Sequence, residues 1–156
     1  MPWASQEPLD FPTRRNIIHG FIEKFKQNQD FTFGIFSKKE KKCIGSTGLH
    51  TRLSSNEREI GYWLHVDYVS QGYITEAVSA LSKVAFEVEK IAALEIHCHK
   101  DNWRSSLVPQ RLGYLKIEKD NTAIDIWRLE QYQYLNNATI KNIDVRAYNA
   151  KGIRLM

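Results

Sequence analysis

Apolar side chains recur along the chain with two different periods. Every third or fourth position is apolar within residues 13–28 and again within residues 74–88, which is helical spacing. Compact runs rich in β-branched and aromatic side chains are typical of strands and occupy residues 31–36, 43–52, 59–66 and 93–99. The pattern predicts a helix, three consecutive strands, a second helix of about four turns and a fourth strand.

The elements predicted after residue 100 are shorter and more polar. Residues 105–112 predict a short helix that ends at Gly113, a residue suited to a C-terminal cap. Two strands are expected at residues 114–119 and 123–130, and residues 131–156 carry a less clear pattern. The whole order predicts an α+β fold: a mixed, mostly antiparallel sheet flanked by helices, with a parallel pair in the later strand–helix–strand unit.

Composition narrows the class of protein. Hydrophobic residues make up 42% of the chain and charged residues 26%, which is ordinary for a soluble globular domain. No apolar run is long enough to cross a membrane, and the N-terminal sequence MPWASQEPLD lacks the features of a secretory signal. Cys43 and Cys98 form no close-spaced motif. We therefore expect a cytoplasmic protein without a membrane partner.

The net charge of +4 is modest and suits an anionic cofactor. Basic residues concentrate only in the run at residues 38–42, KKEKK. This run is typical of a solvated turn between strands, and the alternative is a patch that attracts phosphate or a nucleic acid, as in an RNA-associated protein. We favour the turn and expect no nucleic acid partner.

The chemically informative segment is residues 63–77, WLHVDYVSQGYITEA, where a strand passes through a short loop into a helix. The first amides of a helix have no internal partner and lie at the positive end of its dipole, so they form a ready phosphate site. Gly72 lets a ligand approach the backbone, and Thr75 could add a hydroxyl donor. The competing interpretation is a plain strand–helix connection. The chain has neither a P-loop nor a GxGxxG motif.

Three sequence blocks, one of which lies in this segment, follow one another in a recognisable order. They are EIGYWL at residues 59–64, QGYITEA at residues 71–77 and NWRSSLVPQRLGY at residues 102–114. Together they resemble the GNAT superfamily of N-acetyltransferases, in the branch that includes ribosomal-protein N-terminal acetyltransferases. The resemblance covers roughly residues 30–130, and its specificity comes from the combination of blocks and their spacing.

The resemblance implies a fold and a co-substrate, acetyl-CoA. Two central parallel strands should splay into a V-shaped gap that receives the pantetheine arm, while the pyrophosphate lies on the amides that begin the helix. The asparagine and serine of the third block match positions near the pantetheine and the sulfur. The implied cofactor-binding residues are Leu64, His65, Val66, Gln71, Gly72, Tyr73, Ile74, Thr75, Asn102 and Ser105. No metal is implied.

The sequence departs from the family pattern in several places. Val69 and Ser70 stand where arginine and glycine are frequent, and the third block lacks the tyrosine that serves many members as an acid. Residues 1–156 are expected to form one domain in which the strand and helix that usually come first are missing. Residues 131–156 then form a C-terminal extension, and a hairpin within residues 143–156 is a candidate replacement for the missing strand.

Candidate catalytic residues follow from the need to remove a proton from an ammonium group. Glu59 matches a strand position that supplies the base in several family members; alternatively it is a surface carboxylate paired with Arg58 or Arg52. His50 is a second candidate base, or else a hydrogen-bonded histidine of the sheet. Ser105 could donate to the leaving sulfur, or it caps the helix.

His97 and His99 share one strand face but have no evident third ligand, which disfavours a zinc site. The residues thus favour an enzyme that moves an acetyl group from acetyl-CoA to a primary amine, on a protein N-terminus or a small molecule, by direct attack in a ternary complex. The alternative is a non-catalytic module that binds acyl-CoA or a partner protein. A homodimer is compatible with the sequence.

Overall fold

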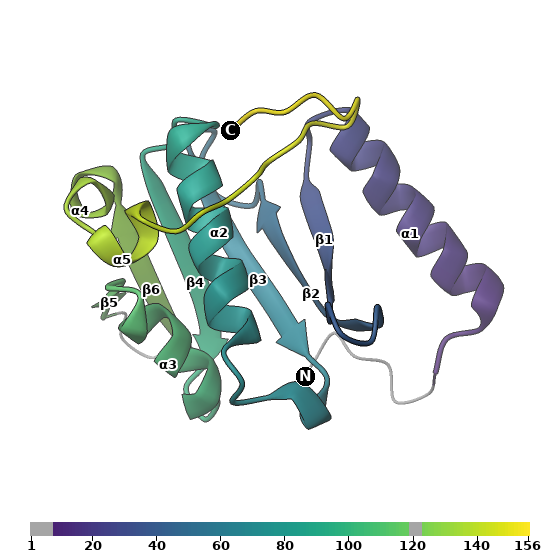
Figure 1. The fold of residues 1–156 in the computed structure, drawn as a ribbon. Coiled ribbons are helices and arrows are strands. Elements are labelled where there is room, and N and C mark those ends of the chain that lie inside the picture. The colour runs from purple at the N-terminus through teal and green to yellow at the C-terminus, as the bar shows by residue number, and fades with distance from the viewer. Residues whose placement is uncertain (1–7, 119–122) are drawn as a thin grey trace.

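The computed structural model describes residues 8–118 and 123–156. Six strands form one sheet in the order β1-β2-β3-β4-β6-β5 (Figure 1). Their bounds are β1 Phe31–Phe36, β2 Cys43–His50, β3 Glu57–Leu64, β4 Ala93–His99, β5 Leu115–Ile117 and β6 Ile124–Glu130. All neighbouring strands are antiparallel except β3 and β4. The predicted α+β sheet with one parallel pair is confirmed.

Helices precede, cover and follow this sheet. They are α1 Phe11–Lys26, the 3-10 turn η1 Val66–Tyr68, α2 Tyr73–Glu87, α3 Trp103–Arg111, α4 Gln131–Leu135 and α5 Ala138–Lys141. The two helices α4 and α5 were not predicted. The predicted C-terminal hairpin forms in short form: an antiparallel bridge joins Tyr148 to Arg154, and backbone hydrogen bonds run from Leu155 to Ala147 and from Asn149 to Ile153. It is not a strand of the sheet, so it does not replace the missing strand. The chain after α5 runs across α2 towards α1 (Figure 1).

Helix α2 provides the centre of the core because its apolar positions recur along one face. Val78, Leu81 and Ala85 are buried against the sheet. The strand residues of the same cluster are Leu49, Ile60, Leu94, Ile96 and Leu129. Burial of each large aliphatic side chain stabilises the fold by about 1.5–3 kcal/mol, so α2 is held firmly in place.

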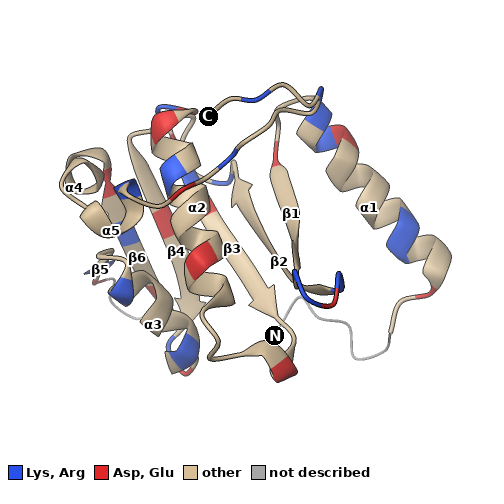
Figure 2. Ribbon diagram, in the orientation of Figure 1, with Lys and Arg blue, Asp and Glu red and all other residues tan. Residues whose placement is uncertain are grey.

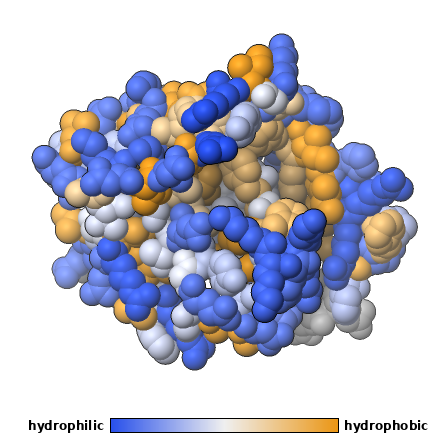
Figure 3. Space-filling view, in the orientation of Figure 1, coloured by the Kyte–Doolittle hydropathy of each residue, from blue (hydrophilic) through white to orange (hydrophobic). Residues whose placement is uncertain are grey.

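Helix α1 has a similar apolar spacing but buries none of its residues. Ile18 is 56% exposed, whereas Phe25 near the end of the helix packs edge-to-face on Phe31 and Phe33 of β1. Figure 3 shows a recessed apolar surface over the sheet between α1 and α2. Helical periodicity therefore predicted both helices correctly, but it did not reveal how deeply each is buried.

The parallel strands β3 and β4 separate soon after they pair. Their register joins Glu57 to Ala93, Arg58 to Leu94 and Glu59 to Glu95, and no later pair is formed. Both strands continue beyond this point, to Leu64 and His99. The predicted V-shaped splay is confirmed, and its apex lies at the pair formed by Glu59 and Glu95.

Candidate functional site

A pocket of about 330 Å³ lies beside the C-terminal half of β3, between the start of α2 and helix α3. Seven of the residues predicted to bind the cofactor line it: Leu64, Gly72, Tyr73, Ile74, Thr75, Asn102 and Ser105. Three others, His65, Val66 and Gln71, are outside the lining. Segments far apart in the sequence thus converge on one cavity.

The start of α2 faces this pocket without a cap of its own. Gly72 is the N-cap residue, with φ of +88°, and it makes no side-chain hydrogen bond. The first bond of the helix runs from the Glu76 amide to the Gly72 carbonyl at 2.9 Å, so the amides of Tyr73, Ile74 and Thr75 have no partner within the helix. A Cβ added at Gly72 would meet nothing within 4 Å. These amides fit the needs of a diphosphate.

The free edge of β3 is the second element of the pocket. His65 donates its amide to Ile44 at 2.8 Å, and its carbonyl accepts from Tyr68. Because backbone groups alternate along a strand, those of Leu64 and Tyr62 point the other way, into the splay. Both backbone groups of His65 are therefore hydrogen-bonded within the protein. The backbone groups of Leu64 are better placed to pair with a ligand.

Tyr62 connects β3 to α3 inside the pocket. Its hydroxyl donates to the Ser105 carbonyl at 2.9 Å and accepts from the Ser105 hydroxyl at 3.1 Å. Burial raises the pKa of Tyr62 above its ordinary value, and the hydrogen bond with Ser105 opposes this only in part. Tyr62 therefore stays protonated and acts as a hydrogen-bond donor. The sequence analysis did not single out Tyr62.

Helix α3 supplies polar and cationic side chains. Its N-cap is Asn102, whose side chain accepts from the Ser105 amide, so the alternative in which Ser105 caps the helix is wrong. Arg104 and Arg111 also line the pocket, and the sequence analysis missed both. Their spacing of two helical turns within the third block was the signal that could have found them.

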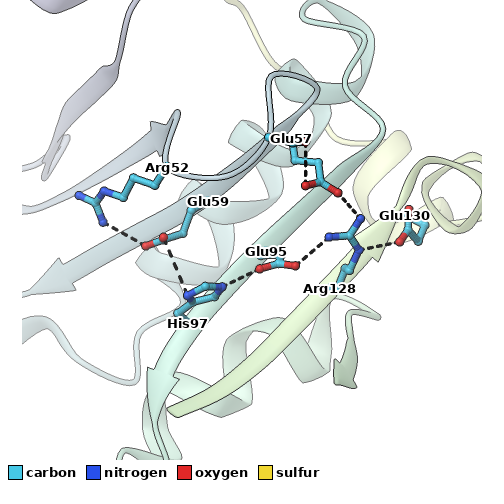
Figure 4. Close-up of polar contacts among 8 residues, drawn as sticks. Arg52, Glu57, Glu59, Glu95, His97, Arg128 and Glu130 are labelled. Carbon is cyan, nitrogen blue, oxygen red and sulfur yellow. Dashed lines mark hydrogen bonds and ion pairs between the residues drawn. The ribbon is translucent and has the colours of Figure 1, made fainter. Parts of the chain in front are cut away.

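A chain of charged side chains lies on the face of the sheet opposite α2, at the apex of the splay (Figure 4). Glu59 contacts Arg52 through one carboxylate oxygen at 3.1 Å, and its other oxygen lies 3.9 Å from Nδ1 of His97. The pairing with Arg52, which the sequence offered as the alternative to a catalytic role, is thus present, whereas Arg58 binds Glu89. The side chain of Glu59 is 15% exposed, so its carboxylate is largely shielded from solvent.

The chain continues through β4 to β6. Nε2 of His97 lies 2.6 Å from Glu95, and Glu95 accepts from Arg128 at 2.7 Å. Arg128 also donates to Glu57 and Glu130. Burial acts to raise the pKa of Glu95, but the hydrogen bonds from His97 and Arg128 outweigh it and leave the pKa below its ordinary value. Glu95 is therefore a fixed anion behind His97.

His50 lies on β2, where its Nδ1 is 2.9 Å from Asp30. Its ring packs against Gly61, whose Cβ, if present, would come within 3.2 Å of Nε2. His50 and Glu59 are register partners in neighbouring strands. The two predicted bases thus occupy adjacent strands, while Ser105 lies in the pocket on the side of the sheet that carries α3.

The lysine-rich run forms the turn between β1 and β2, as the sequence favoured (Figure 2). Glu40 in this turn accepts from the hydroxyl of Tyr68 in η1 at 2.5 Å. Within residues 8–118 and 123–156, no group of three acidic, histidine or cysteine side chains is arranged to hold a metal. No helix in the same ranges is long and apolar enough to span a membrane.

Known proteins share both the sequence pattern and the architecture. The family model of the acetyltransferase (GNAT) domain matches residues 1–115. YjcK of Bacillus subtilis, a probable N-acetyltransferase by its name, is 28% identical over 78% of this chain and 69% of its own length.

Two further similar proteins carry ribosomal acetylation in their names. YdaF of Bacillus subtilis, by its name a candidate ribosomal N-acetyltransferase, is 34% identical over 48% of this chain and 42% of its own length. The ribosomal-protein-S5-alanine acetyltransferase of Vibrio fischeri superposes with a TM-score of 0.70 at 21% identity, over 83% of this chain and 79% of that one. The predicted resemblance is confirmed: the chain belongs to the GNAT family of acetyltransferases.

Proposed function

We propose that this protein transfers an acetyl group from acetyl-CoA to a primary amine by direct attack within a ternary complex. The observation that carries the proposal is the splay of β3 and β4, with a pocket and an uncapped helix start on one side and a carboxylate–imidazole cluster at its apex. The ribosomal relatives make protein N-termini the first acceptors to test, with small amines as the second class.

Acetyl-CoA would use the groups that line the pocket. The amides of Tyr73, Ile74 and Thr75 would hold the diphosphate, and the β3 edge at Leu64 would pair with the pantetheine amides. Arg104 and Arg111 add positive charge beside an anionic ligand. Asn102 would lie near the pantetheine, and its side chain already caps α3.

The reaction requires three events. The ammonium of the acceptor loses a proton to a base, for which Glu59 and His50 are the sequence candidates. The neutral nitrogen then attacks the thioester carbon, so that the C–N bond forms and the C–S bond breaks. The nitrogen then gives up its second proton, and the thiolate takes up a proton and leaves as CoA thiol. Hydrogen bonding from the Tyr62–Ser105 pair would stabilise the thiolate once the Ser105 hydroxyl turns from Tyr62.

The experiment has two stages. Calorimetric titration with acetyl-CoA should give saturable binding, and thiol release should then be measured with octapeptides that begin with Ala or Ser and with spermidine. Binding followed by turnover with at least one acceptor supports the proposal. Absence of acetyl-CoA binding overturns it, and binding without thiol release from any acceptor replaces it with the non-catalytic module.

A further inference from the structure

The apex of the splay contains a histidine, His97, to which the family resemblance assigned no role. His97 lies on β4 two residues beyond Glu95, in the part of the strand that no longer pairs with β3. Its side chain is 29% exposed, between Glu95 at 11% and Glu59 at 15%. Solvent therefore reaches the His97 ring more easily than it reaches the two carboxylates beside it.

The contacts of His97 fix which of its nitrogens can accept a proton. Nε2 lies 2.6 Å from Glu95, and an ionised carboxylate can only accept, so Nε2 carries the hydrogen. Arg128 holds Glu95 in the ionised form from the other side, at 2.7 Å. In the neutral ring, the lone pair then resides on Nδ1, which points towards Glu59.

The distance between Nδ1 and the Glu59 oxygen is informative. At 3.9 Å it is too long for a direct hydrogen bond. Two proton acceptors that face each other across such a gap can both bind one donor placed beside it, either an ammonium group or a bridging water. The same atoms lie at the apex of the splay, next to the edge along which the thioester would run.

We propose that His97, in its Nε2–H tautomer, is a catalytic base that shares the acceptor's proton with Glu59, and that Glu95 and Arg128 are positioning residues. This inference rests on the proposed acetyl transfer. The ammonium proton passes to Nδ1, the resulting imidazolium lies between two carboxylates, and it later releases the proton to solvent. Together with C–N formation and C–S cleavage, one amide, one CoA thiol and one proton result.

The charged groups around His97 come from several elements of the fold. They are Glu59 from β3 and Glu95 from its own strand, while Arg52 and Arg128 each bind one of these carboxylates. His50 flanks Glu59 from β2. Both nearest charges are negative, so a carboxylate lies on either side of the ring when it carries the transferred proton.

The kinetic test is the pH dependence of a His97→Gln variant. At pH 7 an α-amine is mostly charged, so turnover should fall about 100-fold; above about pH 9 the amine is already neutral, so the loss should shrink to less than about fivefold. Glu59→Gln/His97→Gln should lose little more than the worse single variant, because the two act on one proton. A loss of the same factor at both pH values would indicate mere structural damage and overturn the proposal.

His99→Gln is the matched control. His99 lies on the same strand face, is 51% exposed and contacts only Asp101 among the ion pairs of the described chain, so its turnover should stay at the wild-type level. A positioning role for Glu95 predicts that Glu95→Gln lowers kcat at pH 7 with little change in KM, and that the loss shrinks above about pH 9 as it does for His97→Gln. An unchanged profile would remove Glu95 from the relay.

A second measurement separates this inference from the proposed function. The ¹⁵N–¹H correlations of the His97 ring in the full chain near pH 8 should report the Nε2–H tautomer, and Glu95→Gln should weaken that preference because a neutral amide oxygen is a weaker acceptor than a carboxylate. An Nδ1–H tautomer would overturn the proposal, even if acetyl transfer is found. Absence of acetyl transfer in the wild type would instead overturn the proposed function, and the ring measurement would still decide whether the Glu95–His97 pair is built for proton transfer.

Discussion

The two sides of the splayed strands differ in what they offer a ligand. The pocket side presents backbone amides at an uncapped helix start, a free strand edge and two arginines at its border. The apex presents side chains that hold one another in place, from Arg52 through His97 to Arg128 (Figure 4). Binding on the first side should therefore resist most side-chain substitutions, whereas chemistry on the second should depend on single atoms.

The largest expected effect is on the apex. Glu59→Gln should lower kcat about 100- to 1,000-fold, because the amide can no longer accept a proton. The acetyl-CoA Kd from calorimetry should stay at its wild-type value, since Glu59 is outside the pocket lining. Unchanged turnover would remove Glu59 from the chemistry, and a weakened Kd would show that the two sides are not independent.

Loss of Arg128 tests whether the side chains of the apex are mutually dependent. Arg128→Met leaves Glu57 and Glu95 without their shared cation, and the free energy of unfolding at pH 7 should fall by about 2 kcal/mol. Lys26→Met breaks an exposed pair with Glu23 and should cost less than about 0.5 kcal/mol. Urea denaturation would measure both.

The stability that Arg128 confers should depend on pH in a definite direction. Hydrogen bonding to Arg128 is the main cause that lowers the pKa of Glu57, and the pKa of Glu95 is also lowered against the effect of burial. A carboxylate with a depressed pKa stabilises the fold above its unfolded pKa, and this contribution is lost as the pH falls from about 5 towards 3. Arg128→Met should flatten that acid dependence; parallel curves for the variant and wild type would contradict it.

The sequence was informative about the two sides to different degrees. The pocket side depends on neighbours in sequence: a glycine, a helix start and a block ending at Tyr114, so motif and periodicity could locate it. The apex depends on register, since Glu59, His97 and Arg128 meet only because three strands align. No local pattern carries that alignment. The same limit applies to α1, whose periodicity gave the helix but not its exposure.

An intermediate effect is expected where the backbone itself is changed. Gly72→Ala places a Cβ in the open space before α2 and requires an alanine at φ of +88°. The fold should lose about 1–2 kcal/mol from this strain, and the acetyl-CoA Kd should rise about tenfold if the added methyl occupies the diphosphate site.

Gly152→Ala is matched to this variant in strain. Gly152 has φ of +75° and equally open surroundings, but it does not line the pocket. Its unfolding free energy should fall by a similar amount while the acetyl-CoA Kd stays unchanged. Equal changes in Kd for both variants would show that general destabilisation, and not the helix start, sets the affinity.

The smallest expected effect concerns the arginines at the border of the pocket. Arg111 is exposed, so Arg111→Gln should weaken acetyl-CoA binding only about two- to fivefold at low salt. The difference should fade at about 0.5 M salt, because the screening length is then only a few ångströms. Arg14→Gln removes the same charge from α1, away from the pocket lining, and should leave the Kd unchanged. Calorimetry at both salt concentrations measures the contrast. A loss that persists at high salt would mean that Arg111 makes a desolvated contact, and the pocket side would then depend on side chains more than its backbone geometry suggests.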